Sequence, residues 1–380
     1  MGKNLRLEDA LQLGRPLSVG IMVKPVGAAC NLACRYCYYR GASSGVMSRE
    51  MLERTVREAI AANDGPEVVF NWHGGEPLLA GLDFFREAVQ LEKRYADGKR
   101  ISNSIQTAGL LLTPDWASFF RDEDFLVGIS IDGPVSVHDA FRRDVHGAGT
   151  FDRVLRGVGL LQSAGAQFNT LTTVNQASRG RGLEIYLFLK SIGSRYLQFL
   201  PVSDPLRPEN IDAEGFGDWI CAVYDEWVRH DVGRVFVNLF DATLAAWCGL
   251  PRGLCTSCET CGGSVTVDWS GNLYACDHFH GETQRLGNLA RESLRDVLCS
   301  SAYFDFSHQK RESLPVKCLR CKYRFACGGE CPAHRLHGRN LLCEGYRRFF
   351  VHSEPTMLRM RELLDQGRAP AEVLQRYGSR

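Results

Sequence analysis

Short apolar segments alternate with amphipathic ones along the N-terminal half of the chain. Continuous apolar runs of strand length predict buried parallel strands, and such runs lie at residues 18–24, 67–72, 101–106, 126–131, 167–174 and 196–200. Stretches with helical periodicity lie between them, at residues 48–62, 82–95, 114–121, 151–162 and 182–192. Repeated strand–helix units predict an α/β fold built on an open, partial (β/α)6 TIM-like barrel.

Residues with functional groups gather at the ends of these predicted strands. A loop with Cys30, Cys34 and Cys37 follows the first strand, and the sequence HGGEP at residues 73–77 follows the second. Residues 107–109 (TAG), 130–134 (SIDGP) and Pro201 occupy the ends of later strands. Because barrel active sites form where strands end and loops begin, we expect the active site at this edge.

The pattern changes past Asp204. A helix is predicted at residues 213–230 and a strand at 234–238, and a segment dense in Cys and Gly then runs from residue 253 to residue 343. We place a domain boundary near Leu250, which gives a barrel at residues 1–250, a cysteine-rich domain at 251–345 and a helical tail at 346–380. We expect this tail to pack against the domain or to fray, and not to take part in catalysis.

Composition narrows the possible functions. Lys and Arg number 45 against 44 Asp and Glu, so no overall field would concentrate nucleic acid or anionic lipid. The chain has neither a signal peptide nor an apolar run long enough to span a membrane, and we expect a cytoplasmic protein. Its 15 cysteines are closely spaced and odd in number, which favours metal or cluster ligands over disulfides.

The first cysteine loop, Cys30-x3-Cys34-x2-Cys37, offers three thiolates, which can hold three irons of a [4Fe–4S] cluster and leave the fourth iron without a protein ligand. The amino and carboxylate groups of a methionine moiety would fit that open iron, and Tyr36 could place its ring near an adenine. The alternative is a zinc site, with His73 as the fourth ligand.

This loop, with an aromatic residue before its third cysteine, resembles the signature of the radical S-adenosylmethionine superfamily. The resemblance implies that an electron from the cluster cleaves S-adenosylmethionine to a 5′-deoxyadenosyl radical, which abstracts hydrogen from an unactivated carbon. Residues 74–77 resemble the GGEP motif of the family, in which Gly74, Gly75 and Glu76 approach the methionine group. Further positions that match cofactor contacts of the family, besides Tyr36, are Gln106, Ser130, Asp132, Arg142 (or Arg143) and Leu200.

The C-terminal cysteines resemble a SPASM domain, which implies two auxiliary [4Fe–4S] clusters and three clusters in all. The first auxiliary cluster would be bound by Cys255, Cys261, Cys276 and Cys331, and the second by Cys318, Cys321, Cys327 and Cys343. Cys258 departs from the pattern and leaves open whether Cys255 or Cys258 is the ligand. A pair of zinc knuckles is the alternative. Cys221, Cys248 and Cys299 are interpreted as structural thiols.

Several stretches together are similar to the anaerobic sulfatase-maturating enzymes, among them residues 22–25, 72–79, 104–107, 128–134, 198–201 and 274–278. The resemblance implies oxidation of a Cys or Ser in a sulfatase, within a Cys/Ser-x-Pro/Ala-x-Arg motif, to Cα-formylglycine. It implies Asp277 as the base for the substrate proton, with His278 and His280 as alternatives, and an external low-potential electron donor. Nucleic acid and membrane are not expected as partners.

One departure affects the substrate. The family commonly has Gln-Thr-Asn-Gly where this chain has Gln106-Thr107-Ala108-Gly109, so a hydrogen bond from that Asn to peptide or cofactor is not inherited. Modification or crosslinking of a ribosomally made peptide is the alternative reaction. The short segment before Cys30, with no room for a leader-binding domain, argues mildly against it. A scaffold that holds only zinc is the non-catalytic alternative.

Overall fold

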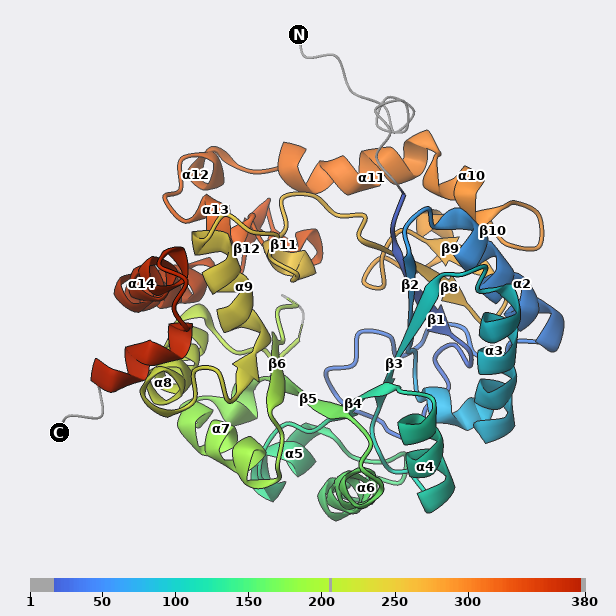
Figure 1. The fold of residues 1–380 in the computed structure, drawn as a ribbon, viewed down its shortest axis with the longest axis horizontal. Coiled ribbons are helices and arrows are strands. Elements are labelled where there is room, and N and C mark those ends of the chain that lie inside the picture. The colour runs from blue at the N-terminus through green and yellow to red at the C-terminus, as the bar shows by residue number, and fades with distance from the viewer. Residues whose placement is uncertain (1–16, 205–206, 377–380) are drawn as a thin grey trace, which may run out of the picture.

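The computed structural model describes residues 17–204 and 207–376, and one large sheet organises this part of the chain. Its strand order is β10-β9-β8-β1-β2-β3-β4-β5-β6-β7 (Figure 1). The strands are β1 (Gly20–Lys24), β2 (Glu67–Trp72), β3 (Arg100–Thr107), β4 (Leu126–Ser130), β5 (Phe168–Val174), β6 (Tyr196–Pro201), β7 (Phe236–Val237), β8 (Ser264–Asp268), β9 (Asn272–Tyr274) and β10 (Arg285–Asn288). From β8 through β1 and onward to β7, each strand is parallel to its neighbour in this order. β9 pairs antiparallel with both β8 and β10.

Helices cover the outer side of the curved sheet (Figure 1). Those of the barrel are α2 (Arg49–Ala62), α3 (Leu82–Tyr95), α4 (Pro114–Asp122), α5 (Val135–Phe141), α6 (Phe151–Ala164), α7 (Gly182–Ser191) and α8 (Ala213–His230). Local sequence sets their starts: the Ser48 hydroxyl accepts a hydrogen bond from the Met51 amide, and Thr113 caps α4 in the same way. The predicted succession of six strands and intervening helices is therefore confirmed.

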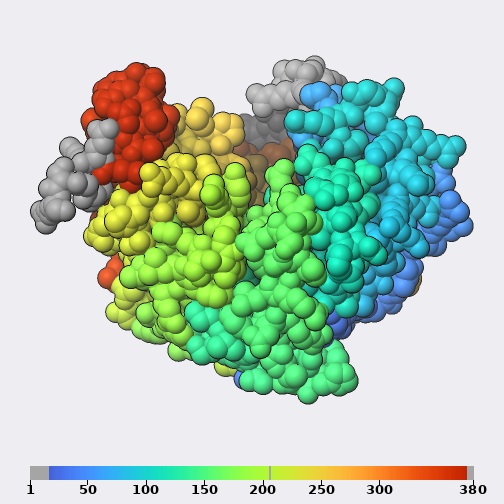
Figure 2. Space-filling model, turned by 60° about the horizontal axis from the view of Figure 1, so that its bottom comes forward, coloured from blue at the N-terminus to red at the C-terminus, as the bar shows by residue number. Residues whose placement is uncertain are grey.

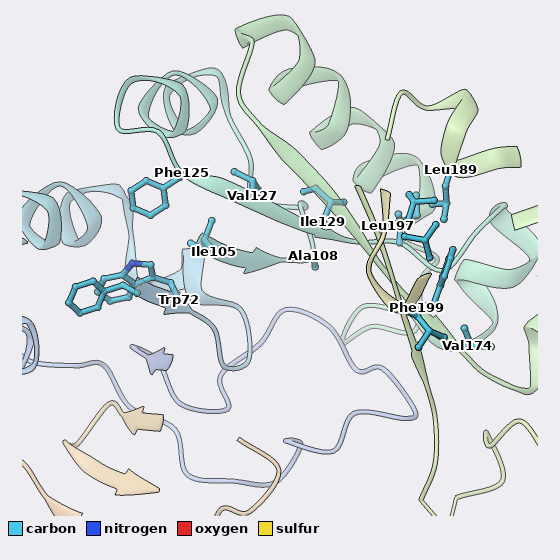
Figure 3. Packing of buried hydrophobic residues seen from close by; sticks show 14 of the residues in the cluster. Trp72, Ile105, Ala108, Phe125, Val127, Ile129, Val174, Leu189, Leu197 and Phe199 are labelled. Atoms are coloured by element: carbon cyan, nitrogen blue, oxygen red, sulfur yellow. The ribbon is translucent and has the colours of Figure 1, made fainter. Parts of the chain in front are cut away.

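The core lies between the sheet and these helices (Figure 3). Val127 and Ile129 of β4 are fully buried, and Trp72 packs edge-to-face on Phe85 with ring centroids 5.3 Å apart. Burying each such side chain stabilises the fold by about 1.5–3 kcal/mol. This packing fixes the strand positions, and through them the loops at the strand ends.

The C-terminal part continues the same sheet. Its helices are α9 (Asn238–Trp247), α10 (Leu294–Leu298), α11 (Ser301–Glu312), α12 (Val316–Leu319), α13 (Arg324–Cys327) and α14 (Cys343–Asp365), and β11 (Arg335–Leu336) forms a hairpin with β12 (Arg339–Asn340). Tyr224 of α8, Phe240 of α9 and Phe349 of α14 share one aromatic cluster, with centroids 5.1–5.6 Å apart. The helical tail therefore packs against the barrel.

One predicted strand differs from the structure, and the predicted domain boundary stays open. The predicted strand at residues 234–238 was wrong at its ends, because only Phe236 and Val237 pair with β6 and Asn238 already begins α9. The proposed boundary near Leu250 follows α9 directly, yet β8 pairs with β1 across it. The three-part division stays a prediction, and its ends at residues 1–16 and 377–380 lie outside the described residues.

Among the residues described, none of the helices combines the length and the apolar character that crossing a membrane requires.

Candidate active site and cluster-binding cysteines

The first cysteine loop leaves β1 and folds over the end of the barrel. Backbone hydrogen bonds from Ala33 to Arg143 (2.8 Å) and from Arg35 to Phe141 (3.2 Å) hold it against the end of α5 and the segment that follows. Burial raises the pKa of the Cys30 thiol to about 12, although an amide hydrogen bond opposes this shift, and the charges of Glu76, Cys34 and Cys37 raise it further. Three neighbouring thiols, one buried and two partly buried, fit a site where a positively charged metal cluster makes thiolates favourable.

Gly74 and Gly75 bring the end of β2 against this loop. A side chain at Gly75 would place its Cβ 2.1 Å from the Ala29 carbonyl oxygen, and one at Gly74 would approach the Gly27 oxygen to 2.8 Å. Gly74 also has a φ of 125°, which L-residues rarely adopt. The two glycines are therefore required for contact between β2 and the cysteine loop, in addition to any contact with a cofactor.

Glu76 is buried, and its carboxylate is hydrogen-bonded to other residues of the protein. It accepts hydrogen bonds from the Thr107 hydroxyl (2.8 Å), the Ala108 amide (2.9 Å) and the Leu78 amide (3.1 Å). Glu76 thus joins the end of β2 to the end of β3. Its predicted interaction with the methionine ammonium stays a prediction.

Tyr36, Asp132 and Arg142 form one buried network between the cysteine loop and the barrel. Asp132 accepts from Arg142 Nε (3.0 Å), from the Thr173 amide (2.9 Å) and from the Tyr36 hydroxyl. The Arg142 guanidinium also lies 5.4 Å from the Tyr36 ring centroid. These residues, predicted separately as cofactor contacts, therefore hold each other and orient the loop that carries Cys34 and Cys37.

The remaining predicted cofactor contacts lie on neighbouring strands. Gln106 Nε2 donates to Ser130 Oγ at 2.8 Å, which links β3 to β4. Leu200, near the end of β6, is 39% exposed. An exposed apolar side chain at a barrel edge fits an adenine ring, and the contacts of Gln106, Ser130 and Leu200 with the cofactor stay predictions.

Asp277 lies where the C-terminal part meets the cysteine loop. It forms an ion pair with Lys24 at the end of β1 and accepts a hydrogen bond from Tyr38. Burial by itself would raise the pKa of Asp277, but the electrostatic effects of Lys24, His73 and His278, together with the Lys24 hydrogen bond, outweigh burial and hold this pKa below its ordinary value. A charged carboxylate is therefore present beside the first cysteine loop at neutral pH.

Sequence reasoning missed Lys24 and Tyr38 as site residues, and it considered His73 only as a zinc ligand. Lys24 is only 1% exposed, and its Nζ lies 3.3 Å from the Tyr39 ring centroid. His73 Nδ1 accepts from the Gly74 amide (2.8 Å), and burial lowers the pKa of this imidazole. A lysine at the end of a predicted buried strand was the available signal, because such a charge requires a partner.

The first predicted auxiliary set comes together in space. Burial raises the pKa of Cys276 to about 12, and the charges of Cys255 and Cys261 contribute to the shift. Burial likewise raises the pKa of Cys331, and the charges of Cys276 and Cys255 act on it. The charge of Cys258 also acts on Cys255 and Cys261, so whether Cys255 or Cys258 is the ligand stays open.

The second predicted set is grouped in the same way. Burial raises the pKa of Cys318, and the charges of Cys343 and Cys321 raise it further. Burial raises the pKa of Cys327 to about 12, with Cys343 and Cys318 again contributing. These four thiols fit a second cluster, whose ligands span α12, α13 and the start of α14.

Two histidines lie beside the first auxiliary set. His278 Nδ1 is 3.6 Å from Cys331 Sγ, and the ligand atoms of His278, Cys331 and His334 lie within 4.8 Å of one another. His334 also contacts the Glu330 carboxylate at 3.0 Å. These donors could serve zinc as well as iron, so the zinc alternative has a structural counterpart at this one place in the described chain.

Two family models match the chain. The model of the radical SAM superfamily matches residues 25–176, and the SPASM model, described as an iron–sulfur cluster-binding domain, matches residues 255–322.

Named relatives match nearly the whole chain. A serine-type anaerobic sulfatase-maturating enzyme of Bacteroides thetaiotaomicron is 38% identical, over 93% of this chain and 94% of the relative. A cysteine-type anaerobic sulfatase-maturating enzyme of Clostridium perfringens is 30% identical, over 90% and 98%. A solved structure described as native anSMEcpe with bound AdoMet and Cp18Cys peptide has a TM-score of 0.85 at 28% identity, over 91% of this chain and 99% of that one.

Proposed function

The chain belongs to the anaerobic sulfatase-maturating enzymes of the radical SAM superfamily, and we propose that it oxidises one Ser or Cys side chain of a sulfatase to Cα-formylglycine. The observation that carries this proposal is the position of Asp277, a largely buried carboxylate beside both the first cysteine loop and Cys276. The reaction needs a radical source, a base and an acceptor for the electron left on the substrate radical. The first cysteine loop, Asp277 and the neighbouring auxiliary cysteine sets would supply these three.

The cysteines would hold the cofactors as follows. Cys30, Cys34 and Cys37 would bind the cluster with an open iron, and the two auxiliary sets would bind one [4Fe–4S] cluster each. When bound, S-adenosylmethionine would supply the radical that removes hydrogen from the substrate Cβ. The network of Tyr36, Asp132 and Arg142 keeps the first loop in place for this binding.

Asp277 would accept the hydroxyl or thiol proton of the substrate at a carboxylate oxygen. Lys24 keeps this carboxylate ionised, and Tyr38 orients it. A low pKa makes Asp277 a weak base, so the proton transfer is expected to accompany radical oxidation at Cβ, which makes the substrate proton more acidic.

The substrate is proposed to be a sulfatase polypeptide with a Cys/Ser-x-Pro/Ala-x-Arg motif, and the reaction requires an external low-potential electron donor. Serine-type relatives are 38–39% identical to this chain, whereas cysteine-type relatives are 28–30% identical. This difference favours the serine peptide as the first substrate to test.

The experiment is anaerobic incubation of the reconstituted enzyme with S-adenosylmethionine, dithionite and sulfatase-motif peptides in Ser and Cys forms, followed by mass spectrometry. Formylglycine corresponds to loss of two hydrogens from the Ser peptide, or to exchange of sulfur for oxygen with loss of two hydrogens from the Cys peptide. 5′-Deoxyadenosine without a peptide change would reject this substrate class.

Asp277→Asn tests the base. We expect S-adenosylmethionine cleavage and iron content to persist while formylglycine formation falls by about 10²–10⁴-fold, the usual contribution of a general base. Asp305→Asn, at an exposed position on α11, is the matched control. Normal product formation by the Asp277 variant would remove this residue as the base.

A further inference from the structure

A patch of positive charge lies on the outer side of the C-terminal part. Lys317 Nζ is 2.8 Å from the Glu344 carboxylate, Arg347 is 4.0 Å from it, and Arg339 also pairs with it. These three cationic side chains are 45–60% exposed. Three positive charges therefore share one carboxylate, and a net positive charge remains at the surface.

Arg320 adds to this patch. It is exposed at the end of α12, and within residues 17–204 and 207–376 no ion pair engages it. We call Lys317, Arg320, Arg339, Arg347 and Glu344 the basic surface. The whole chain carries a net charge of only +1, so this positive charge is a local feature rather than part of a general excess.

Apolar side chains and a groove accompany the charge. Val316 is 61% exposed, Leu319 50% and Val351 54%. An open groove of about 410 Å³ is lined by Glu344, Arg347, Arg348, Val351 and His352. Exposed apolar groups ringed by charge are typical of small, transient protein interfaces.

The basic surface borders the second auxiliary set of cysteines. Lys317 and Leu319 flank Cys318, and Glu344 follows Cys343 at the start of α14. Figure 1 shows α12 and α14 at the periphery of the molecule, and Figure 2 shows α14 projecting from it.

We propose that the basic surface docks an acidic one-electron carrier protein, of the flavin or iron–sulfur class, that takes electrons from the second auxiliary cluster; this rests on the proposed function. Oxidation of the substrate radical releases one electron in each turnover. The carrier would gain this electron, and the cluster would return to its oxidised state. Complementary charge would speed the encounter and orient the carrier, as in other electrostatically steered complexes.

Two arguments favour a carrier over the substrate polypeptide at this place. Asp277 adjoins Cys276 of the first auxiliary set, whereas the basic surface borders the second set. A substrate must reach Asp277, while an electron carrier needs only to approach the second auxiliary cluster. The exposed apolar residues also distinguish this surface from a purely charged site for nucleic acid.

The test measures binding of an acidic, oxidised bacterial flavodoxin to the reconstituted enzyme by isothermal titration calorimetry, at low and high salt. Arg339→Glu with Arg347→Glu is expected to weaken binding at least about tenfold at low salt. Glu344→Gln, which removes the only acidic member of the surface, is expected to tighten it. Arg94→Glu with Arg156→Glu, exposed positions on α3 and α6, makes the same change in net charge elsewhere.

Iron content and dithionite-driven formylglycine formation are measured for every variant. Unchanged flavodoxin binding by the Arg339/Arg347 variant, or equal weakening by the Arg94/Arg156 control, would overturn the proposal even if formylglycine formation is normal. Binding of the sulfatase-motif peptide, instead of flavodoxin, that depends on Arg339 and Arg347 would also overturn it. Absence of formylglycine in the wild type, with charge-dependent flavodoxin binding, would instead count against the proposed function.

Discussion

Replacing Lys24 by Met is expected to destabilise the protein by about 3–5 kcal/mol, the usual effect of removing one partner of a buried ion pair. Lys24 is 1% exposed and its partner Asp277 15%, so water would poorly compensate the remaining carboxylate. The lost cation–π contact with Tyr39 would add roughly 0.5–2 kcal/mol. Because Tyr38 and His278 still face Asp277, we expect the lower end of this range.

A double variant separates charge from packing. Lys24→Met combined with Asp277→Asn removes both charges, and its stability is expected to lie much closer to the wild type than that of Lys24→Met alone. Lys93→Met, at the pair of Lys93 and Glu123 with side chains 65% and 29% exposed, is the control and should cost at most about 1 kcal/mol.

The assay is urea unfolding of the reconstituted proteins under anaerobic conditions, followed by circular dichroism, with midpoints compared at equal slopes. A Lys24→Met variant as stable as Lys93→Met would refute the reasoning, because loss of the Lys24–Asp277 ion pair would then cost no more free energy of unfolding than loss of an exposed pair. A double variant no more stable than Lys24→Met would show that Lys24 acts through packing alone.

Three further outcomes are expected. Gly75→Ala should displace the first cysteine loop, because its Cβ would meet the Ala29 oxygen at 2.1 Å. Iron analysis and electron paramagnetic resonance should then show loss of the first cluster. An unchanged spectrum would contradict the packing argument. Burial raises the pKa of Glu92 from 4.5 to about 8, so the folded state binds more protons than the unfolded state between these values, and the free energy of unfolding should fall as pH rises from about 4.5 to 8. Glu92→Gln should remove part of this dependence and stabilise the protein at pH 7 by about 1–3 kcal/mol, measured by thermal unfolding across pH; an identical pH profile would exclude Glu92 as the cause. Cys255→Ala should lose one auxiliary cluster while Cys258→Ala keeps both, as measured by iron and sulfide content, and the reverse result would exchange their roles.

Much of the barrel could be predicted because its strands and helices have characteristic local sequence patterns. The strand Glu67–Trp72 and the helix Leu82–Tyr95 have the predicted bounds, since a short buried run and an amphipathic period each end at turn residues. β7 is shorter than predicted because only two residues pair with β6. Periodicity identifies an apolar run, but it does not determine how many of its residues pair with a neighbouring strand.

Contacts between distant segments were beyond sequence patterns. The cysteine motifs indicated cofactor ligands, but nothing local shows that Lys24 meets Asp277, or that Asp132 pairs with Arg142. The same holds for β8 beside β1, where the pairing joins residues that lie far apart in the sequence. Such contacts depend on tertiary structure, which a single sequence does not reveal.

The pairing of β1 with β8 has a consequence for synthesis of the protein. Gly20–Lys24 emerges from the ribosome early, but its partner Ser264–Asp268 follows only after most of the barrel has been made. Until then one edge of β1 stays open, and contacts of such long sequence separation form slowly. Nascent or truncated barrels are therefore expected to need protection from aggregation, and stable insertion of the first cluster is expected to wait for the C-terminal half of the chain.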